Sequence, residues 1–364
     1  MPAPASPPEE RRAMSDPVVA RPKPCLVSLK SGRTYFWCRC GRSANQPFCD
    51  GSHEGTGLEP KTFVARADEE VLLCGCKHSA DAPFCDGTHT NLPGGSPLDD
   101  PTSTANRAIP WVTDREGPRL RLNGACYVVS PTLAEKATRG DLTYSYLVTA
   151  ALGATYQTQI LLEVTGAASP VMSLGECDVI LFVIAGRGTI NISGRAFEVK
   201  ATDGIYLRPS EAMQLLPASQ TLKVFALSCP PGTLQWHESM PANFDARYGQ
   251  RVASVDEAQR RATGPRYFQL LVDKRIGSQL ITQFIGHIPR SKAAPHRHLY
   301  EEAIIVLSGE GCLWTEDRKA HVRAGDVIFL PRKQLHSLEA TAAEGIDVVG
   351  VICPGDNPSI TYYD

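Results

Sequence analysis

The chain has 364 residues and a net charge of −2, and it contains no basic stripe that would suit a nucleic acid or an anionic membrane. No apolar run reaches the roughly 18 to 20 residues that cross a bilayer, and the N-terminus lacks the apolar core of a signal peptide. The length exceeds that of a usual single domain, so we expect two or three domains. These features favour a cytoplasmic monomer or homodimer whose partners are a small molecule or a redox protein.

Residues 1 to 24 are rich in Pro and Ala. They also carry the acids Glu9, Glu10 and Asp16, which acid-poor organellar transit peptides lack. We expect a disordered tail here.

Residues 25 to 92 contain one pattern twice, with the spacing Cys-x-Cys-x8-Cys-x3-His. The two copies consist of Cys38, Cys40, Cys49 and His53, and of Cys74, Cys76, Cys85 and His89. Each copy is too short to form an apolar core of its own without a metal. Clustered Cys and His in an unexported chain favour metal ligation over disulfides.

The run Pro-x-Cys-Asp-Gly-Ser/Thr-His that ends each copy resembles the CDGSH iron-sulfur family, the mitoNEET-like proteins, over residues 25 to 92. The resemblance implies two [2Fe-2S] clusters, one on each Cys3His set. A structural zinc site is the alternative, although zinc fingers usually separate paired cysteines by two to four residues. Lys77 and His78 lie beside a ligand, where a charged side chain could tune a cluster or simply be solvated.

Residues 93 to 110 combine Pro, Gly, Ser, Thr and Asp without periodicity, which is typical of a linker. From Trp111 onward, short Val-, Ile- and Leu-rich runs separated by turns indicate a mainly β sandwich or barrel. The expected strand regions are 119 to 130, 156 to 164, 178 to 185, 221 to 229, 266 to 276, 278 to 288, 303 to 307 and 346 to 353.

The β region is an internal duplication, since 179 to 188 and 203 to 209 resemble 302 to 311 and 325 to 331. We place a first barrel at 111 to 236 and a second at 266 to 364. The segment 237 to 265 would connect them, with a short helix from Ala253 to Thr263.

His296, His298 and Glu302 are separated by even offsets and would share one face of a strand. His336 would join them from another strand. Three imidazoles and one carboxylate suit a divalent metal such as Fe, Mn, Ni or Zn.

These residues resemble the two cupin motifs, which extend from Gly286 through His296, His298 and Glu302 to Gly309, and from Gly325 through Pro331 to His336. The resemblance implies a bicupin, a pair of double-stranded β-helix barrels. It departs at Lys333, where many cupins have Gly. In the first half the ligand positions hold Ser173, Gly175, Val179 and Gln214, so only the second barrel would bind a metal.

An iron-sulfur unit fused to a metal-binding barrel suggests a non-haem iron dioxygenase whose clusters supply or restore electrons. Glu302 could act as a general base, and Phe284, Trp314 and Phe329 could line a substrate pocket or fill the core. A redox or iron sensor with a ligand-binding barrel, and a metal-dependent isomerase or decarboxylase, are the alternatives. The six cysteines outside the repeats are expected to be mostly buried fillers, at positions 25, 126, 177, 229, 312 and 353.

Overall fold

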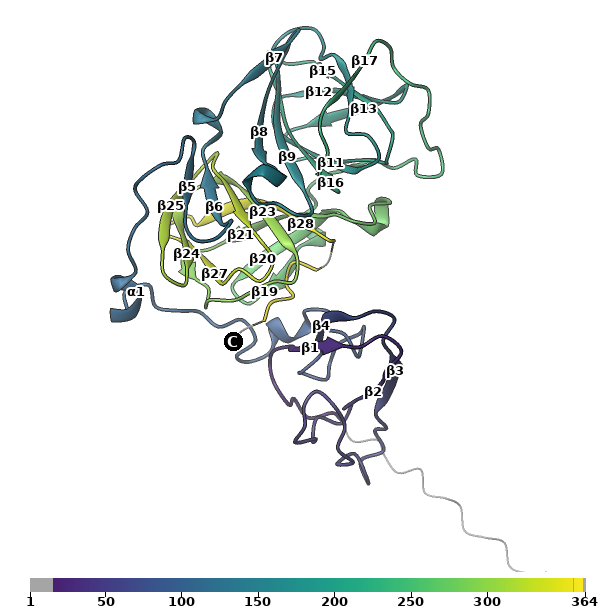
Figure 1. Ribbon diagram of the computed structural model, residues 1–364, viewed down its shortest axis with the longest axis vertical. Helices are drawn as coiled ribbons and strands as arrows, with labels where there is room; N and C mark the ends of the chain where they lie inside the picture. The colour runs from purple at the N-terminus through teal and green to yellow at the C-terminus, as the bar shows by residue number, and fades with distance from the viewer. Residues whose placement is uncertain (1–15, 356, 363–364) are drawn as a thin grey trace, which may run out of the picture. The chain divides into compact units, whose positions relative to one another are not determined.

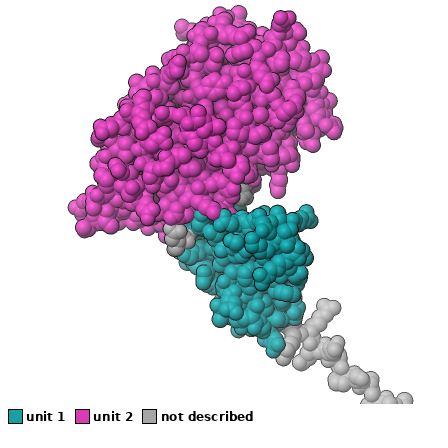
Figure 2. Space-filling view, viewed as in Figure 1, with its two compact units in different colours: residues 1–95, 359–362 teal, residues 96–358, 363–364 magenta. Residues whose placement is uncertain are grey.

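The computed structural model describes residues 16–355 and 357–362. Within these residues the chain forms two compact units, one of 16–95 with Ser359–Tyr362 and one that runs from 96 to 358 (Figure 1, Figure 2). The structure is mainly β, which confirms the predicted fold class. No helix in the described ranges has the length and apolar character that a bilayer crossing requires.

The first unit consists of two small antiparallel sheets. One pairs β1 (Cys25–Leu29) with β4 (Glu69–Leu73), and the other pairs β2 (Thr34–Trp37) with β3 (Lys61–Val64). A short 3-10 helix, η1 (Thr88–Asn91), follows the second repeat. The apolar core of the first unit is small. The buried side chains of Trp37, Leu73, Cys74 and Cys76 form one of its clusters.

The segment before β1 is ordered where we expected a disordered tail, at least within the residues that the structure describes. The Val18 N–H donates to the Cys40 carbonyl (3.0 Å), and the Arg21 N–H donates to the Gly75 carbonyl (3.1 Å). A Cβ on Gly41 would lie 1.8 Å from the Val18 oxygen. The expectation was therefore wrong for residues 16–24, because this segment packs against both repeats. Residues 1–15 lie outside the described part.

The first barrel of the second unit is built from a seven-stranded and a five-stranded sheet. The first has the order β18 (Val252–Ala253), β14 (Gly204–Leu207), β11 (Asp178–Ala185), β16 (Leu222–Cys229), β9 (Thr158–Val164), β8 (Leu142–Val148) and β7 (Ala137–Arg139). The second has the order β13 (Arg195–Lys200), β12 (Arg187–Ile192), β15 (Met213–Pro217), β10 (Val171–Ser173) and β17 (Gln235–His237).

The second barrel repeats this plan with eight and four strands. The larger sheet has the order β19 (Arg261–Thr263), β20 (Arg266–Val272), β21 (Thr282–Ile288), β28 (Ile346–Cys353), β23 (Glu301–Ser308), β26 (Val327–Leu330), β6 (Tyr127–Val129) and β5 (Arg119–Arg121). The smaller has the order β22 (Ser291–Lys292), β27 (His336–Ala340), β24 (Glu310–Thr315) and β25 (Lys319–Arg323).

The two larger sheets share one apolar core between the barrels. It combines Phe182 and Phe225 of the first barrel with Ile305, Phe329 and Val349 of the second. Phe329 is thus part of this shared core. Short 3-10 turns connect strands at η2 (Pro131–Leu133), η3 (Ala150–Leu152) and η5 (Lys274–Ile276).

The expected boundary between linker and first barrel needs correction. β5 and β6 complete the sheet of the second barrel, where Tyr127 pairs with Phe329. The preceding segment also packs on that barrel, since Asp99 forms an ion pair with the buried Lys292 (2.5 Å). It contains the only α-helix of the described residues, α1 (Thr104–Ala108). The sequence of this segment has no amphipathic periodicity, and it therefore resembled a linker. Its position is fixed instead by tertiary contacts with the second barrel, which the sequence pattern does not reveal.

The helix expected from Ala253 to Thr263 was also wrong. β18 and β19 occupy its two ends, and only a single 3-10 turn, η4 (Glu257–Gln259), lies between them. The two strands pair with β14 and β20. These sheet hydrogen bonds override the weak helical spacing of the sequence.

Two of the six scattered cysteines are more than buried fillers. Cys229 and Cys353 form a disulfide, while Cys25, Cys126, Cys177 and Cys312 are free and buried. Single cysteines at distant positions gave no spacing from which this pairing could be predicted.

Candidate metal centres

Each Cys3His motif lies on a loop whose two halves are tied together by main-chain hydrogen bonds. In the first repeat, the Cys38 N–H donates to the Pro47 carbonyl (2.9 Å), and the Cys49 N–H donates to the Phe36 carbonyl (2.8 Å). The second repeat makes the equivalent bonds from Cys74 to Pro83 and from Cys85 to Leu72. The main chain of the preceding strand and of the loop therefore positions the first and third cysteines of each motif.

The Ser and Asp of each motif hold the loop in shape. Ser43 donates its hydroxyl to the Phe48 carbonyl (2.6 Å), and the Asp50 carboxylate accepts the Ala44 N–H (2.8 Å). Ser79, Phe84, Asp86 and Ala80 repeat these contacts at the second site. These side chains satisfy loop donors and acceptors and leave the thiols and imidazoles as metal ligands.

The ligand atoms fall into pairs. In the first repeat, the Cys38 and Cys40 sulfurs are 3.7 Å apart, and the Cys49 sulfur lies 3.2 Å from His53 Nδ1. The corresponding distances in the second repeat are 3.5 Å for Cys74 and Cys76, and 3.3 Å for Cys85 and His89. Two ligands that share a tetrahedral ion at about 2.3 Å lie roughly 3.8 Å apart. Each pair therefore fits one metal ion.

The four donors of the first repeat do not surround a single ion. Among the described residues, no three of their ligand atoms lie within 4.8 Å of one another, as tetrahedral zinc would require. Two separate pairs suit a centre with two metal ions. This geometry weighs against the structural zinc alternative at that site.

The two histidine ligands have different surroundings. His53 Nε2 lies 3.2 Å from the Glu59 carboxylate, and its side chain is partly exposed. His89 is 1% exposed, and its Nε2 has no hydrogen-bond partner among the described atoms. Burial lowers the pKa of His89 to about 4, so this imidazole is neutral and able to ligate at neutral pH.

In the second barrel, His296, His298 and His336 come together, with one ligand atom of each within 4.8 Å of the others. His336 begins β27, and His296 pairs with it through two main-chain hydrogen bonds of 3.0 and 3.1 Å. His298 follows on the same side of the chain, because the even offset returns its side chain to the same face.

The ring orientations of two of these histidines are fixed by main-chain carbonyls. His296 Nδ1 lies 2.8 Å from the Ala294 oxygen, and His336 Nδ1 lies 2.9 Å from the Gln334 oxygen. A carbonyl only accepts, so each Nδ1 carries the proton and Nε2 carries the lone pair. Burial lowers the pKa of His336 to about 4 and that of His296 well below its usual value. His296 and His336 thus have the protonation state of metal ligands.

Glu302 on β23 lies beside this group, not within it. Its carboxylate is 3.5 Å from His298 Nε2, but it is not among the atoms that lie within 4.8 Å of one another. Burial raises the pKa of Glu302 to about 8 in the metal-free protein. The neighbouring Glu301 turns away and accepts the N–H groups of Thr155 and Tyr156.

Apolar side chains line the barrel next to the histidines. Tyr300 stacks on His298, with ring centroids 4.5 Å apart, and belongs to a cluster with Phe268, Leu270, Phe284 and Ile352. Phe284 was expected here from the sequence. Phe268 and Leu270 were missed, although their alternate positions on β20 place them on one face of the strand.

The first barrel has no comparable group among the described residues. Ser173 forms a hydrogen bond with His237 (2.8 Å), Gln214 donates to the Ser169 carbonyl (3.0 Å), and Val179 lies in the barrel core. Apolar side chains fill its interior. The geometry suits a packing partner for the second barrel.

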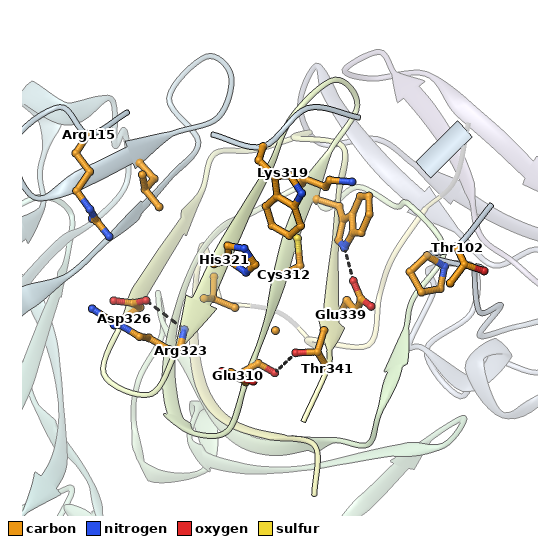
Figure 3. Close-up of a pocket in the computed structure, with 16 residues that line it drawn as sticks. Thr102, Arg115, Glu310, Cys312, Lys319, His321, Arg323, Asp326, Glu339 and Thr341 are labelled. Carbon is orange, nitrogen blue, oxygen red and sulfur yellow. Dashed lines mark hydrogen bonds between the residues drawn. The ribbon is translucent and has the colours of Figure 1, made fainter. Parts of the chain in front are cut away.

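A separate cavity of about 640 Å³ lies on the outer face of the small sheet of the second barrel (Figure 3). Its lining includes Cys312, Trp314 and Glu339, together with Trp111, which stacks on His321 (4.0 Å between centroids). Glu339 and His336 have opposite parity on β27, so the cavity and the histidines occupy opposite faces of this sheet. Trp314 therefore does not line the barrel interior.

Comparisons with known proteins agree with this division of the chain. The family described as iron-binding zinc finger of CDGSH type matches residues 17–54 and 58–90, and a cupin domain matches residues 287–351. The mouse protein named CDGSH iron-sulfur domain-containing protein 3, mitochondrial, is 58% identical over 52 residues, which are 14% of this chain and 38% of that protein. Its human counterpart is 57% identical over 51 residues, 14% of this chain and 40% of that protein. The chain therefore spans about two fifths of these relatives.

Solved structures also resemble this chain over part of its length. Oxalate decarboxylase of Lactobacillus farciminis, in a formate complex, has a TM-score of 0.53 at 13% identity and covers 65% of this chain and 87% of its own. Protein Ylba from E. coli has a TM-score of 0.50 at 16% identity, with 70% and 98% covered. At these identities the likeness shows the fold alone. The first unit thus matches the CDGSH type twice, the second barrel matches a cupin domain, and the chain shares the fold of these solved structures.

Proposed function

We propose that this protein is a redox enzyme in which a metal centre in the second cupin barrel uses dioxygen to oxidise a small molecule. Two [2Fe-2S] clusters in the first unit would supply its electrons or restore its ferrous state. One observation carries the proposal: a single chain holds two sets of paired Cys and His donors and one group of three histidines, of which His298 and His336 are buried.

The donor geometry supports binuclear clusters in both repeats. Each repeat offers one Cys–Cys pair and one Cys–His pair, which would hold one iron each. Replacing one thiolate by a neutral imidazole removes negative charge from the cluster and raises its reduction potential. Clusters of this kind suit delivery of single electrons to an acceptor of moderate potential.

The second barrel would hold a mononuclear metal through His296, His298 and His336. A divalent iron bound there would bring dioxygen and substrate together. Glu302 is buried beside His298. A cation held by the histidines would lower the pKa of its carboxyl and ionise it, so we assign it the role of accepting a proton from the substrate. The apolar wall formed by Phe268 and Phe284 excludes water, which favours a small substrate with an apolar portion.

The proposed location is the cytoplasm, and the proposed partners are the small substrate and a protein that reduces the clusters. The relatives matched by the first unit are mitochondrial by name. A disulfide such as Cys229–Cys353 is uncommon in a reducing compartment. Fractionation of cells that express the full chain would decide between the cytoplasm, the mitochondrion and an oxidising compartment.

The test begins with anaerobic purification of the full chain and analysis of iron, acid-labile sulfide and other metals. The chemically reduced clusters are then mixed, in a stopped-flow instrument, with protein whose barrel metal has been oxidised. We expect the cluster absorbance to return as the barrel metal becomes reduced. Zinc or nickel in the barrel would instead favour the isomerase or decarboxylase alternative, and clusters that never reduce the barrel metal would rule out coupled redox chemistry.

The control is His336→Gln, which copies Gln214 from the equivalent position of the first barrel. This variant should keep the cluster spectrum, because residue 336 lies in the second unit, and should lose both the barrel metal and the stopped-flow reaction. If the clusters of His336→Gln were still re-oxidised at the wild-type rate, their electron acceptor would not be the barrel metal, and the proposal would be wrong.

A further inference from the structure

Two of the residues that differ between the Cys3His repeats contact each other. Trp37 precedes the first ligand of its repeat, where the second repeat has Leu73. Lys77 follows the second ligand of its repeat, where the first has Gly41. The Lys77 ammonium lies 4.7 Å from the centroid of the Trp37 ring. Two of the differences between the loops therefore meet in one contact.

Trp37 connects the ligand set of its own repeat to that of the other. It is bonded to Cys38 through one peptide link, and its indole N–H donates to the carbonyl oxygen of Cys74 (3.0 Å). The ring is 1% exposed and packs in one cluster with Cys74 and Cys76. A path from Cys38 to Cys74 thus consists of covalent bonds, an aromatic ring and a single hydrogen bond.

Lys77 is held at the same point by an unusual backbone. Its φ of +70° lies in the left-handed region, which a lysine rarely adopts, whereas Gly41 takes the equivalent φ of +80° without strain. Its side chain is buried, and Nζ donates to the Cys74 carbonyl (3.2 Å) while the main-chain N–H donates to the Cys74 sulfur (3.2 Å). Strain at a buried charged residue is typical of a functional position.

The Lys77 ammonium also acts on both ligand sets. Its Nζ donates to the Cys74 carbonyl of one set (3.2 Å) and lies over the ring of Trp37, which precedes Cys38 of the other set. A buried cation favours the extra negative charge that a cluster gains on reduction.

We propose that Trp37 forms the electronic link between the two clusters and that Lys77 positions its indole and raises both reduction potentials. The inference rests on the two [2Fe-2S] clusters of the proposed function. In the step itself, one electron leaves the reduced cluster and enters the oxidised one, and no bond or proton is transferred. The first unit would then act as one redox element instead of two independent ones.

The test uses substitutions that the chain itself makes at the equivalent positions. Trp37→Leu copies Leu73 and Lys77→Gly copies Gly41, so both suit the local backbone. The matched controls are Phe36→Leu, at an exposed neighbour of Trp37 on β2, and Lys30→Gln, at an exposed lysine of the same unit. Iron and sulfide content and the visible spectrum check that each full-length variant carries its clusters.

The first readout is electron paramagnetic resonance of the fully reduced protein, in which two coupled spins split each other's signal. Trp37→Leu should reduce this splitting, and Lys77→Gly should also move both midpoint potentials to more negative values. Phe36→Leu and Lys30→Gln should change neither. Unchanged splitting and potentials in loaded Trp37→Leu and Lys77→Gly would overturn the inference.

A second readout measures the transfer directly. His53→Cys gives the first site four thiolates and a more negative potential, so an electron placed there by photoreduction should flow to the second cluster. Freeze-quenched spectra should show this flow slowed when Trp37→Leu is added and unaltered when Phe36→Leu is added. Wild-type protein without two iron-sulfur clusters would contradict the proposed function, whereas loaded clusters with equal transfer rates would contradict only this inference.

Discussion

Cys229 and Cys353 end equivalent strands of the two barrels, β16 and β28, and are joined by a disulfide. The bond closes a loop with a sequence separation of 124 residues. It therefore links the duplicated halves covalently next to the apolar core that they share.

Removing this bond should destabilise the second unit. Cross-links that close long loops restrict the unfolded chain, and by that argument Cys229→Ser with Cys353→Ser should lower the free energy of unfolding by about 3 to 5 kcal/mol. Urea unfolding followed by circular dichroism measures the change. A reductant should lower the stability of the wild type and leave the double variant unaffected; equal stability of both proteins without reductant would show that the bond contributes nothing.

The ion pair between Glu211 and Arg251 is expected to fix the segment around Asp245 on the first barrel. Both partners are buried, with two contacts of 2.5 and 2.7 Å. Loss of one partner leaves a buried charge uncompensated, so Glu211→Gln should cost on the order of 3 kcal/mol of unfolding free energy.

The control for this pair is Glu163→Gln, which removes the partly exposed contact of Glu163 with Lys223 (3.7 Å) on the same barrel. Solvent screens such pairs, so little change is expected in urea unfolding. Similar losses in both variants would mean that burial does not determine the effect.

The cluster ligands could be predicted from the sequence because they are local: each set spans one loop, and its spacing is read directly. The group around His336 followed from strand parity, which places His296 and His298 on one face. Strand parity does not give the distances between ligand atoms, however. Strand twist and side-chain rotamers determine these distances, and the Glu302 carboxylate lies outside the group of three histidines.

Contacts between residues far apart in the sequence were harder to predict than the local motifs. Nothing within residues 119–130 indicates that β5 and β6 join the second barrel, because their partner, β26, lies far along the chain. The disulfide partners and the segment over Gly41 escaped prediction for the same reason. Helical spacing near Glu257 was misleading since sheet pairing at both ends decided the conformation.

Acid should weaken the first barrel through Asp245. Hydrogen bonds and charge from Arg247, with further charge from Arg208, hold the pKa of Asp245 at about 2, below its ordinary value of 3.8. The folded state therefore binds the proton less tightly than the unfolded state, so the stabilisation is complete above about pH 5 and is lost as the pH falls towards 2.

Unfolding midpoints in urea between pH 6 and pH 2.5 check this prediction. The Asp245→Asn variant should be less stable than the wild type at pH 6, and the difference should shrink as the pH falls. A difference that stayed constant over this range would show that the ionised carboxylate is not the source.

Metal binding in the second barrel should depend unequally on its four candidate ligands. His336→Gln should abolish metal retention, because His336 supplies one of the three ligand atoms that lie within 4.8 Å of one another. Glu302→Gln should keep the metal with an affinity about 10 to 100-fold weaker, as expected for a residue that acts next to the ligands.

The matched control for these variants is Glu339→Gln. Glu339 lies on β27 like His336, but its side chain faces the outer cavity and accepts the Trp314 indole N–H (2.9 Å). Its metal content, measured by mass spectrometry after dialysis against a graded chelator, should equal that of the wild type. If Glu302→Gln lost metal as completely as His336→Gln, the carboxylate would have to be a direct ligand that moves into the group when the ion binds, because proximity alone does not account for complete loss.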